Sequence, residues 1–370
     1  MVASLPYSPG PPRPNGSPKR STAWSTQHHG WIPASLCSAS MAVRFANFPT
    51  TTESSLRSKT ADSRCPPKRS PCAHRLDRNP PHRPMPEGDT VWLAGRTLDQ
   101  ALAGQSLVRS DFRVPHLATL DLSGRTVSNV ESYGKHLFFH FDQHAIVHTH
   151  FRMDGSWHLY SPGQRWRGGP GWQIRAMMST ATVTAVGYRL PVIDLFTGAE
   201  RERLISTLGP DLIRDDVDYV VAAQRCLSGD TSRPIGDVLL DQRVVAGLGL
   251  IYVTETLFLH NITPWVHVDQ VPDLAEVLRT ASGLMRANRH HYIQTTTGET
   301  ARDAWHWVYE RTGRGCRRCG ATIEMAWQGR PPQQRLAYWC PRCQSGPAPA
   351  GLSPEERRRL RTQGRSRYRP

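Results

Sequence analysis

The stretch Met85-Pro86-Glu87-Gly88-Asp89-Thr90 directs the interpretation of everything that follows it in this chain of 370 residues. Inside a chain, proline has no N–H, and its amide nitrogen offers no free lone pair. At the start of a chain, proline carries a free secondary amine, and an α-amino group has a pKa near ~8. Such an amine is a nucleophile that forms Schiff-base-type intermediates with electrophilic carbons. The stretch therefore predicts amine chemistry for a chain that begins at Pro86.

The 84 residues that precede Met85 have the composition of an unstructured segment. They hold 14 of the 30 prolines and 12 Lys and Arg against 3 Asp and Glu, and no apolar run shows a helical or alternating period. We expect 1–84 to be a disordered extension that results from a misassigned start, with Met85 as the initiator. A transit peptide and a basic arm that binds nucleic acid are the competing interpretations.

Positive charge is concentrated at the two ends of the chain. The net charge of +15 suggests a polyanionic partner, but the first 84 residues carry +9 and residues 346–370 carry +5, which leaves about +1 for the rest. Net charge alone therefore does not establish a nucleic-acid-binding surface on the folded part. The tail over 346–370 is rich in Pro, Gly and Arg, and we expect it to be disordered and basic.

The segment from Asp89 to Leu195 begins with a helical pattern and continues with short strand patterns. Apolar residues recur with a helical period over 89–102. Alternating or β-branched runs follow at 126–130, 136–141, 145–150, 156–160, 173–177 and 180–186. This order predicts an antiparallel β-sandwich flanked by helices, with a short helix at 200–207, and we expect this N-terminal domain to span 85–208.

Helical patterns dominate from Val217 to Asn288. Asp218 is a candidate N-cap, and further helices are expected at 235–241, 253–259 and 274–288. Gly247 and Gly249 punctuate a double turn over 246–252. We therefore expect a helical domain over 217–300 and assign the whole chain to the α+β class.

Cysteines near the C-terminus occur in two Cys-x2-Cys pairs separated by 20 residues: Cys316, Cys319, Cys340 and Cys343. This spacing is typical of a structural zinc site, and an iron–sulfur cluster is the minor alternative. Two strand-like runs between the pairs predict a β-hairpin zinc finger over 305–345. The local arginines favour contact with phosphates, although a purely structural metal site fits the spacing as well.

These features together resemble the formamidopyrimidine-DNA glycosylase and endonuclease VIII family. The resemblance runs from Pro86 to about Gln344 and includes the Pro-Glu-Gly start, the β domain and the cysteine finger. The run Leu239-Leu240-Asp241-Gln242 and the glycine turn after it resemble the helix–two-turn–helix of that family. Asp89-Thr90 and residues 296–302 are more similar to the actinobacterial endonuclease VIII branch.

The resemblance implies base-excision DNA repair by a bifunctional DNA glycosylase and abasic-site lyase that acts on oxidised bases, pyrimidines in particular. Pro86 would attack C1′ of the damaged nucleotide, and β- and δ-elimination would then cut the strand. Glu87 would serve as general acid, a task that needs a carboxyl whose pKa is raised by burial. In an arbitrary protein, a glutamate at this position is a partner of the helix dipole.

Further residues match family positions that contact DNA. Lys135 and Arg335 match side chains that hold phosphates at the lesion, and each has a solvated surface residue as its alternative. Met153 is the expected wedge that offsets the cost of extracting a base, and a core methionine is the alternative. The amides around Gly247 and Gly249 are expected to bind phosphate.

Leu250 departs from the family pattern, which has asparagine directly after Gly-x-Gly. Leucine cannot make that amide's hydrogen bond to a phosphate, which is worth about 1.5–3 kcal/mol. The position therefore predicts weaker DNA binding or slower catalysis. It also supports the rival interpretation, a catalytically weak or inactive DNA-binding protein that senses damage.

The expected partners and location follow from the same set of features. We expect damaged double-stranded DNA as the partner, with abasic or single-stranded DNA as the alternative, and one structural zinc ion. No signal peptide or membrane-spanning stretch is visible in the sequence. The chain is therefore expected to be a cytoplasmic, nucleoid-associated monomer without membrane contact.

Overall fold

The computed structural model describes residues 85–301, 303–331 and 334–359. The extension predicted over 1–84 lies outside the described residues, as does the end of the tail. Within the described part, no helix is long and apolar enough to cross a membrane.

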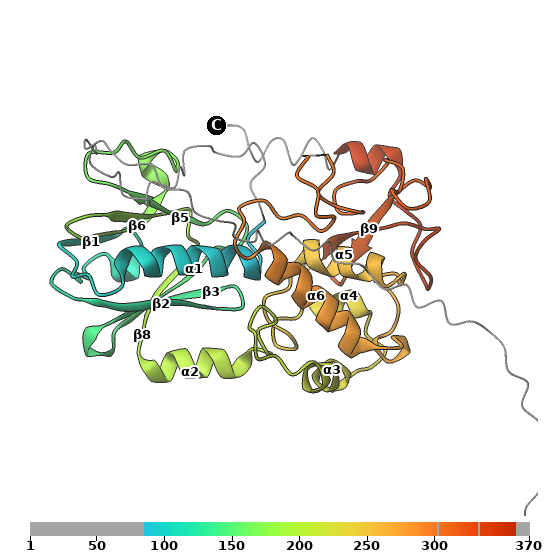
Figure 1. Cartoon of the computed structure of the whole chain (residues 1–370), viewed down its shortest axis with the longest axis horizontal. Coiled ribbons are helices and arrows are strands. Elements are labelled where there is room, and N and C mark those ends of the chain that lie inside the picture. Colours follow the sequence, from blue (N-terminus) through green and yellow to red (C-terminus); the bar gives the residue numbers. More distant parts are fainter. Residues whose placement is uncertain (1–84, 302, 332–333, 360–370) are drawn as a thin grey trace, which may run out of the picture. The chain divides into compact units, whose positions relative to one another are not determined.

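The N-terminal part consists of helix α1 (Gly88–Leu102) and two antiparallel four-stranded sheets (Figure 1). One sheet has the order β1-β6-β7-β5, from β1 (Arg109–Phe112), β5 (Ser156–Tyr160), β6 (Ile174–Ser179) and β7 (Thr184–Tyr188). The other has the order β2-β3-β4-β8, from β2 (Val127–Tyr133), β3 (His136–Phe141), β4 (Ile146–His150) and β8 (Val192–Phe196). Both sheets and α1 contribute side chains to one apolar core, so the predicted β-sandwich is confirmed.

Two strands of this sandwich were not predicted, and one predicted strand begins later than expected. β1 has only one fully buried side chain, Phe112, and therefore gives no alternating signal. β8 was also missed. Residues 180–183 form the turn between β6 and β7, in which the Thr180 amide donates to the Val183 carbonyl at 2.8 Å. Strand β7 therefore starts at Thr184.

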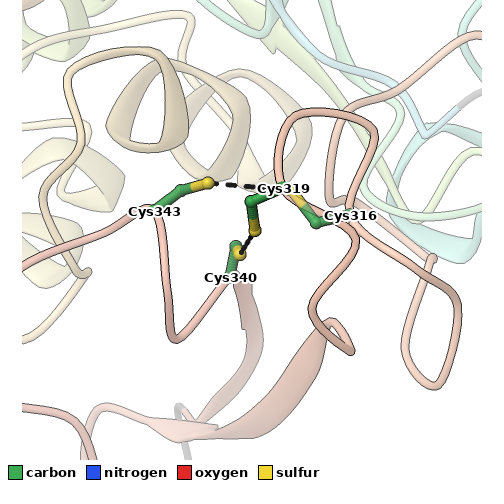
Figure 2. A group of neighbouring side chains, drawn as sticks. All are labelled: Cys316, Cys319, Cys340 and Cys343. Carbon is green, nitrogen blue, oxygen red and sulfur yellow. Dashed lines mark hydrogen bonds between the residues drawn. The ribbon is translucent and has the colours of Figure 1, made fainter.

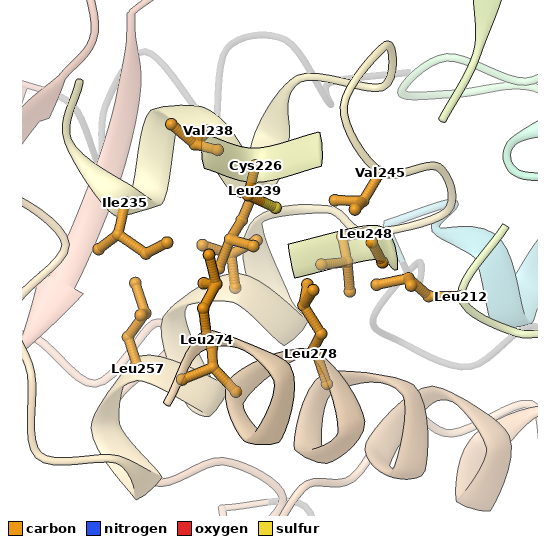
Figure 3. Packing of buried hydrophobic residues seen from close by; sticks show 14 of the residues in the cluster. Leu212, Cys226, Ile235, Val238, Leu239, Val245, Leu248, Leu257, Leu274 and Leu278 are labelled. Carbon is orange, nitrogen blue, oxygen red and sulfur yellow. The ribbon is translucent and has the colours of Figure 1, made fainter. Parts of the chain in front are cut away.

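The helices that follow are α2 (Gly198–Thr207), α3 (Tyr219–Leu227), α4 (Ile235–Leu240), α5 (Leu250–Leu259) and α6 (Leu274–Asn288). Short 3-10 helices lie at Pro115–Leu117, Asp142–His144, Gly171–Gln173 and Val268–Gln270. As predicted, the Asp218 carboxylate caps α3, and it accepts from the amides of Val220 and Val221. Leu239, Leu248, Leu257 and Leu278 are among the buried side chains that pack helices α3 to α6 together (Figure 3).

The C-terminal part is a β-hairpin of β9 (Glu324–Gln328) and β10 (Arg335–Trp339), with Arg335 opposite Gln328. The predicted hairpin between the two cysteine pairs is therefore confirmed. The prediction of a disordered tail is wrong for residues 346–359. Leu352 is buried in the apolar cluster of the hairpin, and its amide donates to the Met325 carbonyl at 2.8 Å. A helical turn then covers 354–359. The exact domain limits stay predictions.

Candidate active site

Glu87 is the residue around which the site is built. It occupies the N-cap position of α1, but its side chain turns away from that helix and is only 1% exposed. Its carboxylate accepts from the amides of Gly249 at 3.0 Å and Ile251 at 2.8 Å. Glu87 therefore caps α5 from a distant part of the chain, and the positive end of that helix faces the carboxylate.

Two glycines contact the residues at the start of α1: Gly249 leaves space for the Glu87 carboxyl, and Gly247 accepts a hydrogen bond from Gly88. A Cβ on Gly249 would lie 2.4 Å from Cδ of Glu87, so a larger residue would displace the carboxyl. Gly247 has a φ of 95°, and its carbonyl accepts from the Gly88 amide at 2.9 Å. Its own amide donates to the Gln242 side chain at 3.0 Å. Because both glycine amides have partners within the protein, their predicted contact with phosphate stays a prediction.

The surroundings of Glu87 favour its protonated form. Burial raises the pKa of this carboxyl to about 7, with the Lys135 ammonium opposing the rise and the nearby Asp89 carboxylate adding to it. A carboxyl with a pKa near neutrality can donate a proton at physiological pH and can take it back in a later step. The burial of Glu87 thus meets the requirement that the implied role of general acid sets, and the role itself stays a prediction.

Asp89 is a second buried carboxylate at the same site, and the sequence did not assign it a role. It accepts from the Tyr252 hydroxyl at 2.6 Å and from Nε2 of Gln294 at 2.9 Å. Burial raises its pKa. Its place in the Pro-Glu-Gly-Asp-Thr stretch, two residues after Glu87, was the only available signal, because Tyr252 and Gln294 lie far away in sequence.

Lys135 lies in the turn between β2 and β3, which is tied to the helical part of the chain. Gly134 in this turn has a φ of 55°, and its amide donates to the buried Asp211 carboxylate at 2.8 Å. The Lys135 side chain is half-buried. Burial lowers its pKa, Glu87 opposes that change and Arg335 adds to it. Lys135 is therefore close enough to Glu87 and to Arg335 for both charges to affect its pKa, while the roles of these residues toward DNA stay predictions.

The remaining predicted residues differ in their surroundings. Pro86 is half-buried directly before Glu87, and Arg335 is exposed at the first position of β10. Met153 is 57% exposed in the turn between β4 and β5, so the core alternative is wrong for this methionine. Leu250 is 9% exposed and packs into the apolar cluster of the finger. Whether this position contacts DNA stays a prediction.

The four predicted cysteines converge in the finger, as Figure 2 shows. Their sulfur atoms all lie within 4.8 Å of one another, with 3.9 Å between Cys316 and Cys343 and 3.4 Å between Cys319 and Cys340. Tetrahedral zinc with Zn–S bonds of ~2.3 Å separates its sulfur ligands by roughly 3.8 Å. The cluster is therefore consistent with a zinc site.

Comparison with protein families gives two matches that cover most of the sandwich and most of the helices after α2. Residues 85–188 match the formamidopyrimidine-DNA glycosylase N-terminal domain, and residues 208–285 match the formamidopyrimidine-DNA glycosylase H2TH domain. The first match begins at Met85, directly before the stretch that supplies Glu87 and Asp89. The second match includes the double glycine turn.

Individual proteins agree with these family matches. The chain is 51% identical over 267 residues to a probable endonuclease 8 2 of Streptomyces coelicolor, covering 72% of this chain and 96% of that protein. It is 39% identical over 265 residues to the DNA-(apurinic or apyrimidinic site) lyase Nei2 of Mycolicibacterium smegmatis, covering 70% and 99%.

Solved structures agree on the fold. The formamidopyrimidine-DNA glycosylase of Lactococcus lactis, bound to DNA containing an abasic site, superposes with a TM-score of 0.58 at 23% identity, covering 70% of this chain and 100% of that one. The two family matches and the sequence relatives therefore point to one family. The chain belongs to the formamidopyrimidine-DNA glycosylase and endonuclease 8 family.

Proposed function

We propose that this protein is a bifunctional DNA glycosylase and abasic-site lyase of base-excision repair. The observation that carries the proposal is the buried Glu87 carboxyl, held by the amides of α5 directly after Pro86 and with a pKa raised to about 7. A general acid that works at neutral pH requires a pKa in this range. The relatives named endonuclease 8 and DNA-(apurinic or apyrimidinic site) lyase support the same activity.

The reaction begins with the amine of Pro86, which exists only when no residue precedes it. We infer that the active form starts at Pro86 after removal of Met85. The nitrogen lone pair attacks C1′ of the damaged nucleotide, the C1′–base bond breaks with its electron pair on the base, and the base takes up the proton that the amine nitrogen loses. Glu87 then protonates the ring oxygen O4′, the C1′–O4′ bond breaks, and the nitrogen lone pair forms the iminium at C1′.

The iminium then acts as an electron sink for strand cleavage. It acidifies the C2′ proton, and loss of that proton expels the 3′ phosphate in β-elimination. A second proton loss expels the 5′ phosphate in δ-elimination, and water finally releases the sugar remnant from the Pro86 nitrogen. Glu87 is the residue placed to carry protons between these steps, because its pKa lies near neutrality.

The cationic side chains around Glu87 would hold the phosphates of the lesion strand. Lys135 stands on a turn fixed by Asp211, so its ammonium is presented with little loss of freedom on binding. Arg335 is exposed at the edge of the hairpin, and its planar guanidinium suits two phosphate oxygens. Met153 is an exposed apolar side chain of a size that can fill the space of an extracted base.

We further propose that the four cysteines hold one structural zinc ion. Cys316, Cys319, Cys340 and Cys343 would ligate it as thiolates, and the ion would link the two chain turns that flank β9 and β10. Such an ion supplies folding energy and takes no part in the chemistry. Its role would be to present Arg335 at a fixed place beside Glu87.

The preferred lesion is the finer part of the proposal. We assign oxidised pyrimidines in damaged double-stranded DNA as the substrate class, and the cytoplasm as the place of action. The rival, a catalytically weak damage sensor, rested on Leu250. Leu250 packs into the apolar cluster of the finger, and the trapping experiment below distinguishes the rival from the enzyme.

Borohydride trapping on oligonucleotides that contain an abasic site or an oxidised pyrimidine tests the activity. The chain that starts at Pro86 is expected to give a covalent protein–DNA adduct, and the chain that retains residues 1–85 is expected to give none. An absent adduct with both chains would rule out the lyase. An adduct with the full chain, shown by mass to retain its front, would rule out Pro86 as the nucleophile.

A further inference from the structure

Asp89 is a buried carboxyl for which the proposed reaction has no task. It lies two residues after Glu87 in the first turn of α1 and is 1% exposed. Its two oxygens accept from the Tyr252 hydroxyl at 2.6 Å and from Nε2 of Gln294 at 2.9 and 3.1 Å. The Thr90 hydroxyl is a weaker third donor at 3.4 Å. Hydrogen bonds that a carboxyl accepts favour its ionised form, so these contacts indicate a negatively charged Asp89.

One glutamine, Gln294, is held with its amide nitrogen toward Asp89, and its side chain is 5% exposed. The next residue is fixed by Asn288, because the Thr295 amide donates to Oδ1 of Asn288 at 2.9 Å and Nδ2 of Asn288 donates to the Thr295 carbonyl at 2.8 Å. Oε1 of Gln294 has no hydrogen-bond partner among the described residues. A protonated Asp89 would offer that oxygen a donor if the amide turned over, whereas a carboxylate requires the nitrogen. The orientation of Gln294 therefore agrees with a charged Asp89.

Tyr252 links Asp89 to Glu87. This tyrosine is fully buried on α5. Its hydroxyl donates to Oδ2 of Asp89, and its amide donates to Oε2 of Glu87 at 3.5 Å. Both carboxyls thus lie against the first turn of one helix, and each is 1% exposed. Charges interact strongly at such a site, because little water screens them.

Charged and titratable groups face this pair of carboxyls, directly or through Lys135, from several segments of the chain. They are Lys135 in the β2–β3 turn, Arg335 on β10, Tyr252 on α5 and Tyr309 before the hairpin. Burial raises the pKa of both tyrosines well above the usual range, so they stay neutral. The Lys135 ammonium favours the ionised form of Glu87, and the Asp89 carboxylate opposes it. Asp89 therefore offsets the effect of Lys135 on Glu87.

We propose that Asp89 is a positioning residue for the acid step, because its negative charge, maintained by Tyr252 and Gln294, keeps the proton on Glu87. Lys135 alone would favour a Glu87 that has no proton to give. Lys135 has to stay cationic to hold a phosphate, so an anion that does not contact the substrate allows both residues to work at the same pH. The inference rests on the proposed function, since a retained proton matters only to an acid.

Titration of Glu87 tests the inference without any catalysis. NMR would follow the carboxyl carbon of Glu87, identified by its loss in Glu87→Gln, against pH in the full chain of 370 residues, where Pro86 is not an amine. The parent midpoint is expected at about 7. Asp89→Asn keeps the shape of the side chain and removes its charge, so it should lower the midpoint by about one pH unit. Glu202→Gln is the matched control, because it also converts a carboxyl to an amide but at a side chain that is 70% exposed on α2. It should leave the midpoint unchanged.

Gln294→Leu tests how the charge on Asp89 is maintained. Without the amide, Asp89 takes up a proton more readily, so the midpoint of Glu87 should fall in this variant as well. The double variant with Asp89→Asn should show no further fall, because both changes act through one charge. The alkaline limb of the pH profile of base excision, measured with the chain that starts at Pro86, should move to lower pH by the same amount as the midpoint. The rate on the acidic side should stay within about twofold of the parent.

A Glu87 midpoint that stays or rises in Asp89→Asn would overturn the proposal, and so would shifts that add in the double variant. If Asp89→Asn does not fold, an unchanged midpoint in Gln294→Leu overturns it. If none of the chains excises a base, the proposed function fails, while the titration still decides whether Asp89 keeps the proton on Glu87.

Discussion

Gly249→Ala is a single methyl group added where the structure leaves no space for it. The new Cβ would lie 2.4 Å from Cδ of Glu87. Carbon atoms in contact are separated by ~3.5 Å or more, so the carboxyl has to retreat by about 1 Å. The amides of Gly249 and Ile251 would then lose their acceptor, at about 1–3 kcal/mol each. A displacement of this size typically slows catalysis about 100-fold, and we expect that loss in the rate of base excision.

The assay is single-turnover release of an oxidised pyrimidine from a duplex by the chain that starts at Pro86. Gly283→Ala on α6 is the matched control, because its added Cβ meets nothing within 4 Å. Thermal melting separates loss of folding from loss of catalysis. The reasoning also requires that Gly249→Ala adds nothing to the defect of Glu87→Gln, since both act through one carboxyl. Additive defects in the double variant, or a rate for Gly249→Ala within threefold of the parent, would refute it.

Three further outcomes are expected. The raised pKa of Glu87 means that the folded state holds a proton which the unfolded state releases, so stability falls as the pH rises from 4.5 to about 7, by up to roughly 3 kcal/mol. Melting curves should show that Glu87→Gln removes this part of the pH dependence of stability. An unchanged pH dependence in the variant would contradict the raised pKa of Glu87. Lys135→Ala should lower the slope of log affinity for DNA against log salt concentration by about one. It should also move the alkaline limb of the pH profile of base excision to higher pH, because the ammonium lowers the Glu87 pKa. A shift of this limb to lower pH would exclude the coupling. Cys340→Ser should abolish metal binding in atomic absorption, and a chelator should then lower the melting temperature of the parent but not of the variant.

Much of the fold was accessible from the sequence, because its signals are local. The runs at 136–141 and 156–160 became β3 and β5 without change, and 274–288 became α6. The start of α5 was placed three residues late, because the Glu87 side chain caps this helix from 162 residues away in sequence. The structure of residues 346–359 has a similar cause. Leu352 becomes a core residue only when β9 provides the surface that buries it.

Site residues could be predicted from the sequence where they belong to a known motif. Residues that join the site only through tertiary contacts could not be predicted. Glu87 and the four cysteines stand in recognisable patterns. In the structure, Glu87 is buried against the amide of Gly249, and the four cysteines lie together. Asp211 gave no such signal, because its function is to accept from the Gly134 amide in another part of the chain. Gln294 likewise has meaning only through its contact with Asp89. Leu250 was judged against a family pattern, which could not show that its side chain packs on the finger.

Buried carboxylates join the sandwich to the helical part of the chain. Glu87 reaches the amides of α5, Asp89 reaches Tyr252 and Gln294, and Asp211 reaches the amide before Lys135. Burying such a group is costly unless its hydrogen bonds are complete, so each carboxylate fixes the distance between two segments closely. Burial raises the pKa of all three, to about 7 for Glu87 and about 6 for Asp211. The contacts that Glu87 and Asp211 make therefore gain negative charge as the pH rises through about 6 to 7, so the geometry of the site and its acid chemistry depend on the same protons.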